Sequence, residues 1–177
     1  MLDEHREYER LIGPIEDQMI RAVWGITQDP EDAEEAFQDA LSVIWRRWHR
    51  IQRHPNPHAL VLRICLNAAY DLLRKKIRRR RREALAEIRT AVQSLTPAES
   101  LDSRERESAI FRAIGQLSRN QATAVFMRLV QGRSYDEIAQ VLGCKSATVR
   151  KHVERGRDRL RELLAPIAPH LNRESVQ

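Results

Sequence analysis

Apolar residues recur at intervals of three and four along almost the whole chain, and no segment alternates apolar with polar positions as a half-buried strand does. This periodicity predicts an all-helical protein. The first helical stretch ends near Thr27, and Gly13-Pro14 marks its start or a kink within it. Asp29 can then cap the next helix, and Pro30 can occupy its first position.

The second and third predicted helices each have one apolar and one polar face. The second runs from Pro30 to about Arg50, and a polar loop over residues 53–57 leads into the third. In the second helix the apolar stripe comprises Ala33, Phe37, Ala40, Leu41, Ile44 and Trp48, and the opposite side comprises Glu35, Gln38, Asp39, Ser42 and Arg46. In the third, the apolar face comprises Leu62, Cys65, Leu66, Ala69, Leu72, Leu73 and Ile77. Its other face comprises Arg63, Asn67, Asp71, Arg74 and Arg78, which we call the polar ladder.

The third helix ends in a basic run. Eight of the nine residues from Arg74 to Arg82 are Lys or Arg, a density that repels itself unless it meets an anion. A solvated helix end is the alternative, because cations near a helix C-terminus are favourable by themselves. Residues 83–102 are mixed and acidic, and Thr96-Pro97 breaks any helix that their first part forms. We therefore expect two small helical domains, residues 1–82 and 103–164, joined by a flexible linker over 83–102 and followed by a tail over 165–177.

The segment from Ser134 to Leu164 has the pattern of a helix-turn-helix. Ser134 and Glu137 have capping-box spacing. Gly143 stands where the chain needs a residue that tolerates positive φ, and Ser146 can cap the second helix. In that helix Val149, Val153, Gly156 and Leu160 repeat at three and four. Such a buried stripe fixes the rotation that presents the first turns of a recognition helix to the major groove.

The outer face of this second helix suits contacts with DNA. Arg and Lys donate to guanine O6 and N7, Glu accepts from cytosine N4, and polar side chains at the helix start are placed for phosphate. The predicted contact residues are Lys145, Ser146, Thr148, Arg150, Lys151, His152, Glu154 and Arg155. An ordinary basic amphipathic helix is the alternative. The motif by itself indicates DNA binding and not a specific role.

Charge agrees with a polyanionic partner. The net charge of +6 divides into +3 over residues 1–82, −3 over residues 83–102 and +6 over residues 103–164. No run approaches the ~20 apolar residues that span a bilayer, and the N-terminus lacks the apolar core of a signal peptide, which predicts a cytoplasmic protein without membrane insertion. Cys65 and Cys144 have no partner at metal-ligand spacing, so we expect two buried cysteines and neither metal nor cofactor.

Three ordered segments resemble the sigma-70 family of bacterial RNA polymerase sigma factors, in particular its small extracytoplasmic-function (ECF) branch. Residues 29–48, DPEDAEEAFQDALSVIWRRW, look like region 2.2 of that family. Residues 59–76, ALVLRICLNAAYDLLRKK, are similar to regions 2.3 and 2.4, with Asn67, Asp71 and Arg74 in the pattern N-x-x-x-D-x-x-R. Residues 117–161 resemble region 4.

The resemblance implies a transcription initiation factor without catalytic residues. The partners would be core RNA polymerase, through the clamp helices of its largest subunit and the flap of the second largest, promoter DNA, and an anti-sigma factor. The clamp would be bound by Asp32, Glu35, Gln38, Asp39 and Arg46. The −10 element, where strand separation begins, would be bound by Arg63, Asn67, Asp71, Arg74, Lys75 and Arg78. The second helix of the helix-turn-helix would read the −35 element as duplex.

The predicted linker has enough reach for this arrangement. Elements about 17 base pairs apart lie roughly 58 Å apart at 3.4 Å per pair, and residues 84–101 span at most about 60 to 65 Å when extended. A helix within residues 84–94 would shorten that reach, so it would have to belong to a domain or melt on binding.

Two other functions compete with this interpretation. A transcription activator or repressor can carry the same C-terminal module, since residues 148–152 also look like the recognition helix of the quorum-sensing activator family. It would need an N-terminal α/β domain, and residues 1–82 show no strand pattern. A nuclease would need clustered carboxylates for a metal. The acidic run from Glu31 to Asp39 is better explained as the start of a helix complemented by the helix dipole.

Overall fold

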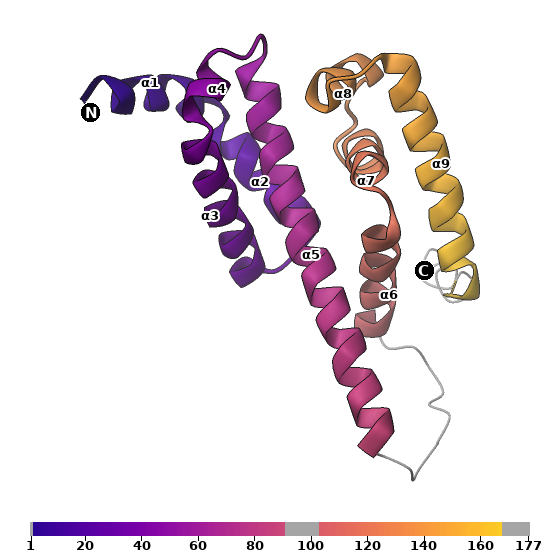
Figure 1. Cartoon of the computed structure of the whole chain (residues 1–177). Helices are drawn as coiled ribbons and strands as arrows, with labels where there is room; N and C mark the ends of the chain where they lie inside the picture. The colour runs from indigo at the N-terminus through magenta and orange to yellow at the C-terminus, as the bar shows by residue number, and fades with distance from the viewer. Residues whose placement is uncertain (1, 91–102, 168–177) are drawn as a thin grey trace.

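The computed structural model describes residues 2–90 and 103–167 (Figure 1). The regular elements within these residues are all helical, which confirms the predicted all-α class. The N-terminal part comprises α1 (Leu2–Ile12), the 3-10 turn η1 (Gly13–Ile15), α2 (Glu16–Thr27), α3 (Pro30–Arg46), α4 (Trp48–Gln52) and α5 (Pro57–Thr90). The C-terminal part comprises α6 (Ser103–Gln116), α7 (Arg119–Val125), the π-helical turn η2 (Phe126–Val130), α8 (Tyr135–Leu142), α9 (Ser146–Leu164) and η3 (Ala165–Ile167).

The helix boundaries in the N-terminal part follow local chemistry. Gly13-Pro14 forms the 3-10 turn between α1 and α2, and the Asp29 side chain caps α3 by accepting the Asp32 N–H at 3.0 Å. The predicted single helix to Arg50 is instead two helices, because the chain leaves helical geometry at Arg47 (φ −109°, ψ 15°) and restarts as α4. The break turns α4 so that Trp48 and Ile51, its two buried residues, both enter the core.

The longest helix, α5, crosses the whole molecule. It continues eight residues past the predicted domain boundary at Arg82, to Thr90. Residues 83–90 contain Ala, Leu, Glu and Arg but neither Gly nor Pro, and these residue types favour continuation of a helix. The first part of the predicted linker is therefore a helical extension of α5. Thr96-Pro97 lies outside the described residues.

The N-terminal core forms where α2, α3 and α5 pack against one another. Its fully buried side chains include Met19, Val23, Ile44, Leu66 and Tyr70, and burial of each large apolar side chain stabilises the fold by about 1.5 to 3 kcal/mol. Trp48, predicted on the apolar stripe, is 5% exposed and lies 5.4 Å from the Tyr8 ring, centroid to centroid. Trp24 and Trp45 are both exposed.

The C-terminal part packs α7 and α8 against α9. Gly156 allows the close approach of α9 to α7, because a Cβ at that position would lie 2.5 Å from Cγ2 of Val125. Cys144, in the turn after α8, is half-buried, whereas Cys65 is buried, so the expectation of two buried cysteines is correct for Cys65 alone. The described helices include none long and apolar enough to cross a membrane.

The two parts pack together along α5. In Figure 1 α5 lies between α2 and α3 on one side and α6 to α8 on the other. The Phe126 ring of η2 covers Gly25 of α2, and Ile77 of α5 packs over Gly115 of α6. This arrangement brings the polar ladder of α5 against the C-terminal part of the chain.

Candidate nucleic-acid interface

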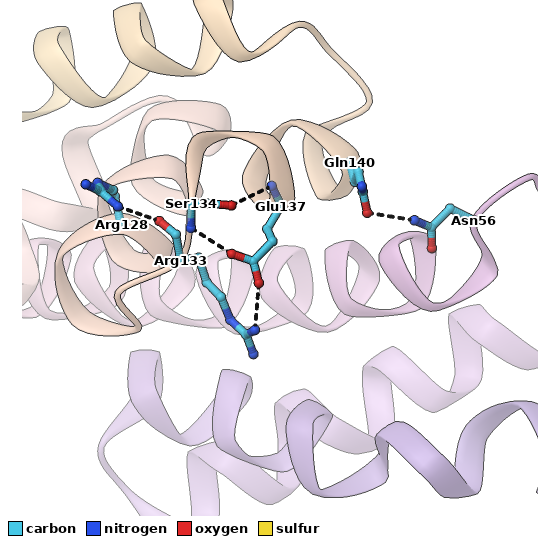
Figure 2. Close-up of polar contacts among 6 residues, drawn as sticks. All are labelled: Asn56, Arg128, Arg133, Ser134, Glu137 and Gln140. Atoms are coloured by element: carbon cyan, nitrogen blue, oxygen red, sulfur yellow. Dashed lines mark hydrogen bonds and ion pairs between the residues drawn. The ribbon is translucent and has the colours of Figure 1, made fainter.

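The helix-turn-helix is formed by α8, a three-residue turn and α9. The capping box at the start of α8 is confirmed, since the Ser134 N–H donates to Glu137 Oε2 at 2.8 Å and the Glu137 N–H donates to Ser134 Oγ at 3.2 Å (Figure 2). Gly143 has φ +64°, as predicted for the turn. The predicted cap by Ser146 is wrong. Ser146 is the first residue of α9, and its hydroxyl donates to the Asp136 carboxylate instead, which ties the two helices together.

Two further polar contacts hold the turn that precedes α8. Arg128 donates to the Arg133 carbonyl at 2.9 Å, and Arg133 pairs with Glu137 at 3.0 Å between Nη1 and Oε1 (Figure 2). The pKa of Glu137 is lowered to about 2, first by the backbone N–H of Ser134, then by the Ser134 hydroxyl and by Arg133. These contacts fix the angle at which the chain enters the motif.

The predicted DNA face of α9 lies open on the surface. Val149, Val153 and Gly156 are buried and set the rotation of the helix. Six of the eight predicted contact residues are exposed: Lys145, Thr148, Arg150, Lys151, Glu154 and Arg155. The other two, Ser146 and His152, are half-buried.

Tyr135 is a member of this face that the sequence analysis missed. Two guanidinium groups contact its ring, with Arg128 at 4.8 Å and Arg150 at 5.2 Å from the centroid. Cation–π contacts of this kind restrict the side chain of an arginine before it binds. An aromatic residue directly after the Ser134 cap was the available signal.

The polar ladder of α5 has a different environment, because two of its arginines donate to carbonyls of the C-terminal part. Arg63 Nη1 lies 2.9 Å from the carbonyl oxygen of Leu142, the last residue of α8. Arg74 donates to the carbonyls of Gly115 and Leu117, at 3.3 and 2.5 Å, where α6 ends. Both arginines are half-buried.

Two further contacts join the α5 region to the C-terminal part of the chain, and they involve Arg119, Asn56 and Gln140, which were not predicted as site residues. Arg119 of α7 binds both carboxylate oxygens of Asp71, at 2.7 and 2.8 Å. Asn56 caps α5 by accepting the Ala59 N–H, and its amide donates to Gln140 of α8 at 3.2 Å (Figure 2). Among the remaining ladder residues, Asn67 is half-buried and Arg78 is exposed.

The predicted polymerase-binding face lies on α3, beside the start of the basic run. Lys75 Nζ lies 3.2 Å from Glu35 Oε1, and Lys76 pairs with Asp32. Lys75, predicted for the −10 element, therefore lies beside a residue of the polymerase face. Gln38 donates to Glu34 at 3.1 Å, and Arg46 donates to the Ser42 carbonyl at 3.2 Å. Glu35, Gln38, Asp39 and Arg46 are exposed, and the Asp32 side chain is 13% exposed.

Cationic and hydrogen-bonding groups, rather than metal ligands, characterise these surfaces. Across residues 2–90 and 103–167, no group of three or more His, Cys, Asp or Glu side chains is arranged to hold a metal ion. These surfaces can donate hydrogen bonds to a polyanion and attract it by their positive charge.

Comparison with known proteins identifies two matching segments and several relatives that match most of this chain. The family model for Sigma-70 region 2 matches residues 11–82, and the model for Sigma-70, region 4 matches residues 107–160, so that together they cover more than half of the chain. The RNA polymerase sigma-E factor of Streptomyces antibioticus is 28% identical over 161 residues, covering 89% of this chain and 84% of that protein. The ECF RNA polymerase sigma factor SigE of Mycolicibacterium smegmatis is also 28% identical, over 89% of this chain and 62% of that protein.

The solved structure of CnrH in complex with the cytosolic domain of CnrY supports the fold. It covers 92% of this chain and 90% of the CnrH chain with a TM-score of 0.51, at 21% sequence identity. The two matched regions occur in the order that the sequence analysis expected, on the helices that carry the two predicted DNA faces. The chain belongs to the sigma-70 family, as an ECF-type RNA polymerase sigma factor, a non-enzymatic subunit for promoter-directed initiation of transcription.

Proposed function

We propose that this sigma factor reads its promoters with two separate faces, the polar ladder of α5 at the −10 element and the outer face of α9 at the −35 element. The observation that carries the proposal is the fixed rotation of α9. Its buried Val149 and Val153 leave six of the eight predicted contact residues exposed on one accessible surface. A helix of about 19 residues with this exposure has the dimensions of a major-groove reader.

At the −35 element, Arg150, Lys151 and Arg155 would donate to guanine edges and Glu154 would accept from cytosine. Tyr135 restricts the Arg150 guanidinium before DNA arrives, so less conformational entropy is lost on binding. Lys145 and Thr148, at the start of α9, are placed for the phosphates that set the register of the helix.

At the −10 element, the polar ladder would bind the strand that leaves the duplex. Unstacking of bases costs a few kcal/mol per step and must be compensated by new contacts. Arg63 and Arg74 would supply charge-assisted hydrogen bonds to phosphate, and the Asn67 amide can pair with an exposed base edge. The exposed arginines that follow, from Arg78 to Arg82, would add sequence-independent attraction.

The polymerase face would be Asp32, Glu35, Gln38, Asp39 and Arg46 of α3. A polar surface of this kind suits a partner that is bound and later released. Lys75 and Lys76 pair with Glu35 and Asp32, so docking of polymerase on α3 would exchange these pairs and free two lysines of α5 for DNA. Binding of polymerase and binding of the −10 element are therefore coupled through the same side chains.

The extension of α5 restricts the spacing between the two faces. If residues 84–90 stay helical at 1.5 Å per residue, the reach of residues 84–101 falls to about 47 to 50 Å. Elements about 17 base pairs apart lie roughly 58 Å apart. Part of the distance must therefore be spanned by the two domains themselves, or the end of α5 must unwind on the promoter.

We also propose an anti-sigma partner and a cytoplasmic location, where RNA polymerase works. Apolar side chains are exposed on both parts of the chain: Ile20, Trp24 and Trp45 in the N-terminal part, and Leu129 and Val130 at the end of η2. Exposed apolar side chains that gather into a patch mark protein–protein contacts. A partner that covers both sets would hold the two parts together.

A run-off transcription assay with bacterial core polymerase and a pool of random promoters tests the proposal. We expect discrete transcription starts with the sigma factor present, and weak binding of promoter duplex by the sigma factor alone. Alignment of the selected promoters should show two conserved elements, of which Lys151→Ala changes only the upstream one. Failure to give discrete starts on any promoter, or loss of both elements in that variant, would contradict the assigned roles.

A further inference from the structure

Trp45 of α3 is an exposed aromatic residue beside the proposed polymerase face. It is 60% exposed, whereas Trp48, three residues later, is 5% exposed and lies in the core. Burial of an aromatic ring against a partner removes a large apolar area from water and stabilises the complex. We propose that Trp45 is the apolar anchor by which core RNA polymerase binds this sigma factor, and that Tyr8 of α1 positions it. This inference rests on the polymerase face proposed for α3.

The position of Trp45 continues the polymerase face to the end of α3. Gln38, Ser42 and Trp45 follow one another at intervals of four and three, so they form one exposed row along the helix. Asp39 and Arg46 are three residues before and four residues after Ser42, which places both next to the same row. A partner that covers these polar side chains therefore also reaches the Trp45 ring.

The polar part of the face orients a partner but supplies little affinity by itself. Glu35, Asp39 and Arg46 are charged and exposed, and ion pairs between exposed side chains are weak and are screened by salt. Protein interfaces gain most of their affinity from a few buried anchors, among which Trp is enriched, inside a rim of polar side chains. A single tryptophan within a charged surface has this arrangement.

Tyr8 holds the Trp45 ring in place before a partner arrives. The two rings meet edge to face, with their centroids 6.3 Å apart and their planes at 66°, a geometry that aromatic pairs prefer. The Tyr8 ring also lies 5.4 Å from the ring of Trp48, which is buried. The contacts among the three rings thus run from the core to the surface. An anchor that is already positioned loses less conformational entropy on binding.

The support for Trp45 comes from the first helix of the chain. Ile12 of α1 is buried, Leu11 packs against the same core, and Gln52 of α4 donates a hydrogen bond to the Glu7 carboxylate. These contacts fix α1 beside the end of α3. Tyr8 lies before residue 11, where the match to Sigma-70 region 2 begins. A part of the chain outside the matched segment would therefore contribute to polymerase binding.

Titration of core polymerase into the dye-labelled full chain, followed by fluorescence anisotropy, tests the anchor. Trp45→Ala should weaken binding about ten- to hundred-fold, whereas Trp45→Phe keeps an aromatic ring and should stay within about threefold of the parent chain. The matched control is Trp24→Ala, which truncates an exposed tryptophan of α2 and should bind core polymerase as the parent does.

Two results of this titration would overturn the proposal. One is equal affinity of Trp45→Ala and the parent chain, and the other is an equal loss in Trp45→Ala and Trp24→Ala. If core affinity is unchanged and sedimentation shows a dimer of the parent chain that Trp45→Ala dissociates, the ring binds a second copy of the chain instead.

The salt dependence of binding separates the anchor from the charged face. Trp45→Ala removes no charge, so the slope of log affinity against log salt concentration should keep the value of the parent chain. Asp39→Lys reverses a charge of the face and should change both the affinity and the slope. A loss in Asp39→Lys alone would leave the face and refute the anchor. A loss in Trp45→Ala alone would refute the face proposed for α3 and leave the anchor.

A double-mutant cycle tests the positioning role of Tyr8. Tyr8→Leu should weaken core binding about threefold, and it should have no further effect in a Trp45→Ala background, because the ring that it positions is then absent. Tyr8→Leu also removes the contact with Trp48, so all four proteins are compared at a temperature at which circular dichroism shows them folded. An equal loss in both backgrounds would show that Tyr8 does not act through Trp45.

Discussion

The two proposed DNA faces of this sigma factor are built from similar residues but differ in their surroundings. The face on α9 carries its arginines, lysine and glutamate exposed, and the ring that orients Arg150 is that of Tyr135 within the same domain. The face on α5 has Arg63, Asp71 and Arg74 bound by groups of the other domain. Polar periodicity in the sequence therefore identifies a polar helix face, but it does not indicate whether solvent or another part of the chain covers that face.

The difference also agrees with the two forms of DNA that the faces would bind. Duplex DNA is present before polymerase arrives, so a face that reads it needs no protection from premature contact. Separated strands exist only after melting, and the proposed −10 face is the one whose side chains are contacted by groups of the other domain.

The largest expected effect comes from loss of the ladder. Arg74→Ala removes a charged donor to the separated strand, which should cost about 1.5 to 3 kcal/mol of open-complex stability with core polymerase. Permanganate reactivity of unpaired thymines at the −10 element measures this. Arg159→Ala is the control, since that residue pairs within α9. Equal melting by both variants would remove Arg74 from the assigned site.

Loss of a direct contact on α9 should be slightly smaller. Arg150→Ala or Lys151→Ala should cost about 1 to 3 kcal/mol of discrimination at the −35 element, measured by competition between promoters that differ in that element alone. Both residues are exposed, so the fold should keep its thermal stability. The assigned role would be wrong if affinity for core polymerase fell as much as promoter selection.

Loss of the ring that supports Arg150 should give a weaker version of the same result. Tyr135→Leu removes the cation–π contacts at 4.8 and 5.2 Å, each worth about 0.5 to 1 kcal/mol at an exposed site. Promoter competition should show a few-fold loss of discrimination at the base pair that Arg150 reads. In an Arg150→Ala background the Tyr135→Leu change should have no further effect on that base pair, and an additive effect would contradict the supporting role.

The smallest effect is a pH dependence confined to the helix-turn-helix. Glu137 has a pKa lowered from 4.5 to about 2 in the folded protein. Its contribution to stability is therefore complete above pH 4.5 and is lost as the pH falls toward 2. Glu137→Gln should remove that part of the acid dependence of thermal unfolding and keep the capping hydrogen bond. An unchanged pH profile would show that the Glu137 carboxylate does not contribute to stability.

Much of the fold was predictable because it depends on local chemistry. The Asp29 cap, the capping box at Ser134, the positive φ of Gly143 and the buried Val149 and Val153 follow from residue type and spacing. Two local predictions were wrong, the cap by Ser146 and the single helix to Arg50. Ser146 bonds to Asp136 rather than capping α9, and α3 ends at Arg46, after which α4 buries Trp48 and Ile51 in the core.

The interface between the domains was not predictable from periodicity. It depends on Phe126 meeting Gly25, on Arg119 meeting Asp71, and on helix ends that lie beside Arg63 and Arg74. Each pair is separated by more than forty residues in the sequence. Helical periodicity assigns these residues to surfaces, and only the packing of the two domains decides which surfaces meet.

Site-specific photocrosslinking on a defined promoter tests the division of labour most directly. A photoreactive amino acid at Asn67 on α5 and another at Lys151 on α9 would each be mapped in the complex with core polymerase. We expect crosslinks from position 67 to the −10 element and from position 151 to the −35 element, with the first appearing only after opening of the complex. Crosslinks from both positions to one element, or from position 67 to the closed duplex in the absence of polymerase, would contradict it.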